Sequence, residues 1–338
     1  MASGIRETVV GIDEVARRAG VSTATVSRAL SGRGPVSPTT RQRVQTAADE
    51  LGYVVSAAAS ALATGRARAI GVIVPFLDRW FYSTVLAGIS DGLVRRGFDI
   101  TLYGVSAAAE ERHRVFSDNV RRRRVDGIIT IAPELDAEEA ELLRSLGVPI
   151  VAIAGPNPLV TTLTVDDRAV GRLATRHLLD LGHRRIAHIG SHETRGSSVP
   201  ALRRRGFTEE MDAAGATPSF ADADFTIEGG SAAARRLLDA VDRPTAIFAA
   251  SDEMAIGAVL AAREAGLRVP QDISIIGVDG NDLGRWFGLT TVDQFARGQG
   301  ERAAEAVLAD LDGAAPALRR GTLPFALLER GSTAVASV

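Results

Sequence analysis

From Ala69 onward, short apolar segments alternate with longer amphipathic stretches. The apolar segments are AIGVIVP, DITLYGV, DGIITIA, PIVAIA, RIAHIG, TAIFAAS and ISIIGVDG. Helical spacing of apolar residues is found over residues 83–97, 138–146, 169–181, 200–214, 231–241, 253–265 and 299–311. Fully apolar strands separated by helices are typical of parallel sheets that are covered on both faces.

These units are too many for one comfortable sheet. We therefore predict an α/β core over residues 69–338 that forms two lobes, each with a doubly wound parallel sheet. In such sheets ligands bind beyond the carboxyl ends of the strands. Two lobes that face each other would then enclose a ligand between them.

The first 54 residues show a different pattern, which predicts three short helices. The apolar residues of the first helix recur at helical spacing: Ile12, Val15, Ala16 and Ala19. Gly20 suits the left-handed conformation that ends a helix, and Ser22 can cap a second helix after a three-residue turn. A third helix is predicted from about Pro38, with Ser37 as its cap. Its apolar stripe is Val44, Ala47, Ala48 and Leu51.

The second helix combines an apolar inner face with an outer face of small residues. Val26, Ala29 and Leu30 form the predicted inner face, and Thr23, Ala24, Ser27 and Arg28 form the outer one. A helix with so few bulky outward residues can sit deep in a major groove, which is about 12 Å wide. There an arginine can pair with guanine, and threonine or alanine can touch a thymine methyl group.

The charge distribution favours nucleic acid as the partner of this N-terminal part. Residues 1–68 carry nine arginines and five acidic residues, whereas the remainder carries 30 basic and 36 acidic residues. A basic head on an acidic body suggests that only the head meets a polyanion. A small helical bundle that binds protein is the alternative for the same helices.

Residues 55–68 join the two parts. Ser56 can cap a short alanine-rich helix over residues 57–63, from which Leu62 projects. A helix of this length is marginal in water and needs a partner to form. Paired with its copy from a second subunit, Leu62 could open a minor-groove base step as an apolar wedge. A flexible linker with an incidental leucine explains the composition equally well.

Two further motifs have structural interpretations. His183 in LGHRRIAHIG is expected to end a helix, where a positive charge is favourable. GQGERA, at 298–303, matches a dinucleotide-binding pattern, but no buried strand leads into it, so we expect a loop that enters a helix.

The segments GIDEVARRAGVSTATVSRALSGRGPVSPTTRQRVQTAADELGY, LLDLGHRRIAHIG and ASDEMAIGAVLAAREAGLRVPQDISIIGVDG together resemble the LacI/GalR family of transcriptional regulators. The resemblance continues to LERGST and covers nearly the whole chain. It implies a helix-turn-helix DNA-binding head at 1–54 and a hinge helix and linker at 55–68. For residues 69–338 it implies a two-lobed core, like that of periplasmic binding proteins, that binds an effector and dimerises.

The resemblance also assigns DNA contacts residue by residue. Thr23, Ala24 and Arg28 match positions that read bases, and Ser22, Thr25 and Ser27 match positions that hold phosphates and the start of the helix. Leu62 matches the hinge leucine that enters the centre of the operator. Relatives usually carry Pro-Asn before the hinge helix, where this chain has Val55 and Ser56.

For the effector, the family pattern points to seven residues. They are Phe81, Tyr82, Asp167, Arg203, Phe225, Ser251 and Asp279. Charged and aromatic side chains of these kinds suit a sugar-like ligand, because Arg and Asp bond hydroxyl groups while aromatic faces cover an apolar ring side. Relatives often have Asn in place of Ser251, and Asn-Pro-Phe-Phe where this chain reads DRWFYS.

The sequence thus predicts a repressor that binds double-stranded operator DNA as a homodimer and responds to a sugar-like effector. No cofactor is expected, and the absence of cysteine excludes disulfides and thiolate chemistry. No apolar run approaches the roughly 20 residues that span a bilayer, and the N-terminus lacks the apolar core of a signal peptide. We therefore expect a cytoplasmic protein with no membrane partner.

Two other classes remain as alternatives. An exported sugar-binding protein would share the two lobes but would need a signal peptide and no helix-turn-helix. An enzyme would need a nucleophile, paired catalytic acids or a phosphate loop, and none stands at a convincing spacing in this sequence.

Overall fold

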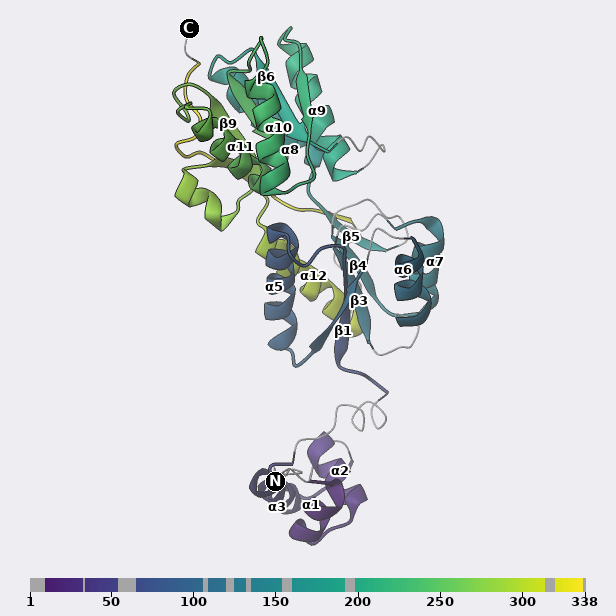
Figure 1. The fold of residues 1–338 in the computed structure, drawn as a ribbon. Coiled ribbons are helices and arrows are strands. Elements are labelled where there is room, and N and C mark those ends of the chain that lie inside the picture. The colour runs from purple at the N-terminus through teal and green to yellow at the C-terminus, as the bar shows by residue number, and fades with distance from the viewer. Residues whose placement is uncertain are drawn as a thin grey trace, which may run out of the picture. The chain divides into compact units, whose positions relative to one another are not determined.

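The computed structural model divides into two compact units, residues 1–68 and 69–338, which are described separately below (Figure 1). The structure describes residues 10–32, 34–53, 65–105, 109–119, 125–131, 135–153, 160–191, 198–313 and 320–336. Leu62 and the rest of the predicted hinge helix lie outside these residues.

The N-terminal unit contains three helices. They are α1 (Ile12–Ala19), α2 (Thr23–Ser31) and α3 (Pro38–Leu51). Gly20 ends α1 with a φ of 63°, and the Ser22 and Ser37 hydroxyls accept hydrogen bonds from the first turns of α2 and α3. The predicted helix-turn-helix and its capping residues are confirmed.

A small apolar core holds the three helices together. Its buried members are Val15, Ala16, Ala19, Val26, Ala29, Val44, Ala47 and Ala48. Six of the eight side chains come from positions that the helical spacing predicted to face inward on α1 and α3, and two from the inner face of α2. Because these residues are small, the helix axes can approach closely and little of α2 is needed for packing.

The second unit has two lobes, and lobe 1 is built on a fully parallel sheet. Its strands are β1 (Ala69–Val74), β2 (Asp99–Gly104), β3 (Gly127–Ile131), β4 (Ile150–Ile153), β5 (Thr161–Thr164) and β11 (Arg320–Thr322), in the order β11-β5-β4-β3-β1-β2. Helices α5 (Trp80–Val94) and α12 (Ala296–Leu311) cover one face. The other face carries α6 (Ala109–Arg114), a π-helix (Val115–Asn119) and α7 (Ala137–Ser145) (Figure 1).

Lobe 2 repeats this plan with one antiparallel edge. Its strands are β6 (Ile186–Gly190), β7 (Ser219–Asp222), β8 (Ala246–Ala249), β9 (Ser274–Asp279), β10 (Thr290–Asp293) and β12 (Ala326–Leu328), in the order β12-β10-β9-β8-β6-β7. Helix α8 (Asp167–Asp180) packs on α9 (Val199–Ala213), and α10 (Ile227–Leu238) packs on α11 (Asp252–Glu264). A 3₁₀-helix, Asp282–Phe287, follows β9.

The chain crosses between the lobes three times: after β5, after β10 and after β11. At the crossings the backbone N–H of Leu323 donates to the carbonyl of Thr164 over 2.7 Å. Each lobe is therefore assembled from segments far apart in the sequence. Among the described residues, these three crossings connect lobe 1 covalently to lobe 2, so they are the segments about which the lobes could turn.

The two-lobed α/β core is confirmed, and the corrections concern its edges. All seven apolar segments form strands, but β5, β7, β10, β11 and β12 were not predicted. Threonines interrupt the apolar pattern of β5 and β10, although those threonines are buried. GQGERA lies within α12 and is not an entering loop.

Glycines set the spacing of the paired helices in the core. A Cβ atom at Gly300 of α12 would lie 2.0 Å from the carbonyl oxygen of Val85 on α5, and one at Gly88 would lie 2.0 Å from that of Arg297. The pairs α8 with α9 and α10 with α11 show the same reciprocal arrangement at Gly171, Gly206, Gly230 and Gly257. Backbone touches backbone at each of these crossings, so no side chain fits.

We expect Gly300→Ala to destabilise the core by about 1 to 3 kcal/mol or more, because a backbone neighbour cannot move aside as a side chain can. Gly298→Ala on the same helix is the matched control, since its Cβ would meet only the Cβ of Phe295 at 3.9 Å. Loss of a helical glycine there should stabilise by about 0.5 to 1 kcal/mol.

Urea denaturation of the full chain followed by tryptophan fluorescence measures this effect, because both tryptophans, Trp80 and Trp286, lie in the second unit, residues 69–338. Equal midpoints for Gly300→Ala and Gly298→Ala would contradict the close helix crossing.

Candidate functional site

The outer face of α2 carries the residues predicted to contact DNA. Thr23, Ala24 and Arg28 are exposed, while Thr25 and Ser27 are half-buried. Ser22 caps the helix, and its hydroxyl also bonds the Thr25 hydroxyl over 2.9 Å. The face thus offers small polar groups near the helix start and one cation a turn later.

Arg28 is held along its own helix. Its Nε donates to the carbonyl of Ala24 over 3.1 Å, and its Cδ lies 3.2 Å from the position that a Cβ would take at Gly34. Gly34 has a φ of 83° and no side chain, so it leaves room for the arginine stem. Among the described residues, none pairs with the two terminal nitrogens of this guanidinium.

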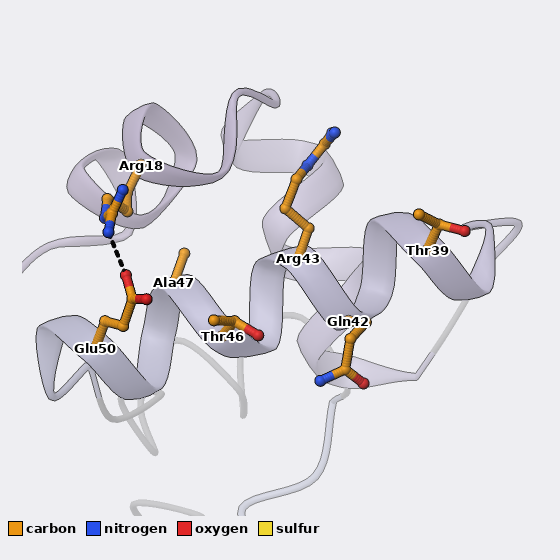
Figure 2. Close-up of a pocket in the computed structure, with 7 residues that line it drawn as sticks. All are labelled: Arg18, Thr39, Gln42, Arg43, Thr46, Ala47 and Glu50. Carbon is orange, nitrogen blue, oxygen red and sulfur yellow. Dashed lines mark hydrogen bonds and ion pairs between the residues drawn. The ribbon is translucent and has the colours of Figure 1, made fainter.

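A pocket of about 350 Å³ lies on a different side of the head (Figure 2). It is lined by Arg18, Thr39, Gln42, Arg43, Thr46, Ala47 and Glu50 from α1 and α3. Arg18 pairs with Glu50 across it over 2.5 Å, as Figure 2 shows. None of the predicted DNA contacts lies in this pocket, so it is separate from the outer face of α2.

In the core, Arg203 is the centre of a buried polar network. Only 4% of this residue is exposed. Its Nε donates to Oδ1 of Asp167 over 2.9 Å, and its Nη1 donates to the carbonyl of Ala250 over 2.5 Å. The same Nη1 lies 3.9 Å from Oδ1 of Asp279. One guanidinium therefore joins the start of α8, the end of β8 and the end of β9.

Asp279 ends β9 in a backbone conformation that L-residues rarely adopt, with a φ of 127°. Oδ1 of Asp279 accepts a hydrogen bond of 2.6 Å from Gln294, which lies at the second crossing between the lobes. Burial raises the pKa of Asp279 to about 7, although Arg203 opposes that shift.

A second carboxylate, Asp252, is fully buried beside this network. Its Oδ2 accepts from the backbone N–H of Asn281 over 2.7 Å, and its Oδ1 has no hydrogen-bond partner. Burial raises the pKa of Asp252 well above its ordinary value, and the nearby charge of Asp279 raises it further. One buried carboxylate oxygen of Asp252 therefore lacks a hydrogen-bond donor.

Three aromatic residues were predicted beside this network. Phe81 and Tyr82, in the first turn of α5, are half-buried, and their rings pack edge to face with centroids 5.6 Å apart. Burial and the charge of Asp279 raise the pKa of Tyr82 to about 12, while Arg203 acts in the opposite direction. Phe225 is half-buried in lobe 2, with a φ of 63° and its carbonyl bonded to Arg79.

Ser251 takes a structural position. It is buried, and its hydroxyl caps α11 by accepting from the backbone N–H of Met254 over 3.3 Å. The helix therefore begins at Asp252, and Ser251 is its N-cap. Asp252 instead points into the buried network.

His183 is also corrected. It follows α8 as predicted, but it is buried, and its two ring nitrogens bond Thr245, Ser274 and the carbonyl of Ala334. Burial lowers the pKa of His183, so the ring is neutral near pH 7 and contributes no helix-end charge.

Sequence reasoning missed Gln294 and the inward role of Asp252, and it did not predict the contact of Arg79 with the Phe225 carbonyl. Gln294 follows directly after β10, a strand that was not predicted, so its position at a strand end could not be predicted either. Among the described residues, no group of three or more His, Asp or Glu side chains could hold a metal ion. The described helices include none that is both long and apolar enough to span a bilayer.

The geometry defines a class of protein: a helix-turn-helix head on a two-lobed ligand-binding core. Residues 11–56 match the family model described as bacterial regulatory proteins of the lacI family, and residues 175–333 match the periplasmic binding protein-like domain. The HTH-type transcriptional repressor PurR of Vibrio atlanticus (strain LGP32) is 34% identical over 88% of this chain and 90% of its own length. The chain belongs to the lacI family of transcriptional regulators.

Further relatives extend the similarity over the whole chain. The HTH-type transcriptional repressor CytR of Escherichia coli (strain K12) is 33% identical over 97% of both chains. The lac repressor dimer bound to operator and the anti-inducer ONPF matches with a TM-score of 0.86 and 29% identity, covering 97% of this chain and all of that one. A LacI-family regulator from Enterococcus faecium with bound ribose matches with a TM-score of 0.72 and 28% identity, over 80% of this chain and all of that one.

The raised pKa of Asp279 predicts a pH dependence of stability. Because the folded-state pKa of about 7 exceeds the unfolded value, this group stabilises the fold at low pH, and the contribution is lost as the pH rises toward 7 and above. Buried His183 and His188 act in the opposite sense, since burial lowers the pKa of both. The difference between wild type and Asp279→Asn isolates the carboxylate.

We therefore expect the stability gain of Asp279→Asn over wild type to be larger at pH 8 than at pH 5. Urea midpoints of the core, followed by tryptophan fluorescence across this range, measure it. A pH-independent difference would show that Asp279 titrates as an ordinary exposed aspartate.

Proposed function

We propose that this protein is a homodimeric repressor whose affinity for operator DNA is controlled by a small polyhydroxy effector bound between the two lobes. The outer face of α2, which carries small side chains and one arginine, supports this proposal. It is the surface of the head best shaped to enter a major groove, and it is not used for packing within the described residues.

On DNA, the two heads would occupy neighbouring half-sites of a roughly palindromic operator. Thr23, Ala24 and Arg28 would meet base edges, and Ser22, Thr25 and Ser27 would position the helix on phosphates. Leu62 would enter the minor groove between the half-sites, as a hinge wedge formed with its copy. The lac repressor dimer bound to operator supports this arrangement.

The effector would bind at the carboxyl ends of the strands, where Arg203, Asp167 and Asp279 meet. The carboxylates need donors, which sugar hydroxyl groups supply, and Phe81, Tyr82 and Phe225 would cover the apolar side of a ring. Ser251 would act as the cap that holds this end of α11. Relatives with bound ribose and cellobiose support the choice of ligand class.

The network also explains how a ligand could act on the head. Asp167 follows the first crossing between the lobes, and Gln294, which binds Asp279, lies at the second. A ligand with different affinities for two lobe arrangements would shift their populations, with coupling typically of about 1 to 3 kcal/mol. We propose no enzymatic activity and a cytoplasmic location.

The DNA contacts are tested by Arg28→Ala, with Arg43→Ala as the charge-matched control from the pocket on α3. If Arg28 pairs with guanine, its loss should weaken binding to a selected operator by about 1 to 3 kcal/mol and reduce discrimination against unrelated duplex. Arg43→Ala should change both affinities equally.

Fluorescence anisotropy with an operator obtained by genomic footprinting measures both variants. Unchanged discrimination in Arg28→Ala would place the reading surface elsewhere on the head.

The effector site is tested by Arg203→Lys, which keeps the charge but loses the fork that binds Asp167 and the Ala250 carbonyl together. Thermal shift of the full chain with a sugar panel that includes ribose and cellobiose identifies a ligand. We expect at least a tenfold weaker ligand response in Arg203→Lys.

Arg205→Lys is the control, because Arg205 is exposed and pairs only with Glu209. An equal ligand response in both variants would remove Arg203 from the effector site.

A further inference from the structure

The start of α5 in lobe 1 touches lobe 2 through one arginine. Nη1 of Arg79 donates to the carbonyl of Phe225 over 3.0 Å, across 146 positions of sequence. Arg79 immediately precedes α5, and Phe225 lies between β7 and α10. This contact therefore joins the two lobes at the edge of the proposed effector site, independently of the three covalent crossings.

The receiving loop is itself rigid. Oδ1 of Asp224 accepts from both the backbone N–H and the hydroxyl of Thr226, at 3.3 and 2.5 Å. Phe225 has a φ of 63°, a conformation that is unfavourable for a residue other than glycine. Such strain persists only where the surroundings enforce it. A fixed carbonyl in this loop gives Arg79 a defined partner.

A second contact lies beside the first. The backbone N–H of Trp80, the first residue of α5, lowers the pKa of Glu253, which lies in the first turn of α11. The N–H groups of a first helical turn have no partner within their own helix, so a carboxylate of lobe 2 is favourable near the start of this lobe 1 helix. Arg79 also attracts the Glu253 carboxylate and thereby lowers its pKa, against the upward effect of burial.

The charges around Arg79 show what its removal would do. Asp78 and Glu228 both raise the pKa of Glu253, and Arg79 lowers that of Asp224. Arg79 thus lies among carboxylates of both lobes. Without the charge of Arg79, the carboxylate of Asp78 in lobe 1 would repel that of Glu253 in lobe 2, because like charges at close range disfavour each other.

We propose that Arg79 is a positioning residue that latches the two lobes together and so sets the lobe arrangement on which an effector acts. The proposal rests on the proposed function for its regulatory meaning, but the latch itself is a property of the core alone.

The absence of cysteine allows a direct test by spin labelling. Val94→Cys in lobe 1 and Val241→Cys in lobe 2 are exposed labelling positions, with 64% and 102% exposure. Double electron–electron resonance on the full chain, without DNA or added sugar and diluted with unlabelled chain, measures the distance between the lobes. We expect one narrow distribution in the otherwise unchanged chain.

Arg79→Ala should broaden this distribution and move it to longer distances, and Arg79→Lys should restore part of the original peak, because lysine still offers one donor and a charge. Arg235→Ala is the matched control: it removes an arginine whose ion pair, with Glu264, lies within lobe 2. We expect it to leave the distribution unchanged.

A distribution in Arg79→Ala that superimposes on the original, or an equal shift in Arg235→Ala, would overturn the latch. Because the sample contains neither operator nor effector, that result would leave the proposed DNA and effector binding untouched. Conversely, failure to bind any operator would not alter the distances measured here.

Discussion

The core depends on one buried cation. The Arg203 guanidinium is enclosed by Asp167, the Ala250 carbonyl and Asp279, and no other described arginine is so deeply buried. A buried ion of this kind is costly unless every donor finds an acceptor. Its neighbours are acidic, and the orphaned oxygen of Asp252 shows that the balance is incomplete. The unmet hydrogen bond therefore lies beside the site proposed for a ligand with hydroxyl donors.

The same network lies at the proposed effector site and next to two of the crossings between the lobes. Asp167 begins α8 directly after the first crossing, and Gln294 joins Asp279 to the second. Gln299, in the first turns of α12, donates in turn to the carbonyl of Gln294 over 2.8 Å. A change in the hydrogen bonding of Asp279 would therefore alter the contacts of Gln294 and Gln299, which lie at the second crossing between the lobes. The proposed latch at Arg79 would add a separate restraint on any turning of the lobes, also from segments that follow the carboxyl ends of strands.

The sequence predicted those elements whose local pattern matches their environment. Six of the seven apolar strands are buried along nearly their whole length, so their composition alone identified them, and the edge strand β2 was found although much of it is exposed. β5 and β10 were missed because buried threonines resemble a polar loop when no partner strand is known. Ser251 and His183 were assigned by residue type, but neighbours distant in sequence decide their roles: one caps α11, and the other bonds β9 and the C-terminal segment.

The sequence pattern is sufficient to predict that Arg203 is buried, but it is not sufficient to predict the contact of Arg79. On α9 the buried residues Gly206, Phe207 and Glu210 follow Arg203 at helical spacing, so the phase of that stripe distinguishes Arg203 from Arg204 and Arg205. No comparable pattern surrounds Arg79, which precedes its helix and meets a carbonyl 146 positions away. This contact joins segments of two different lobes, and local periodicity carries no information about it.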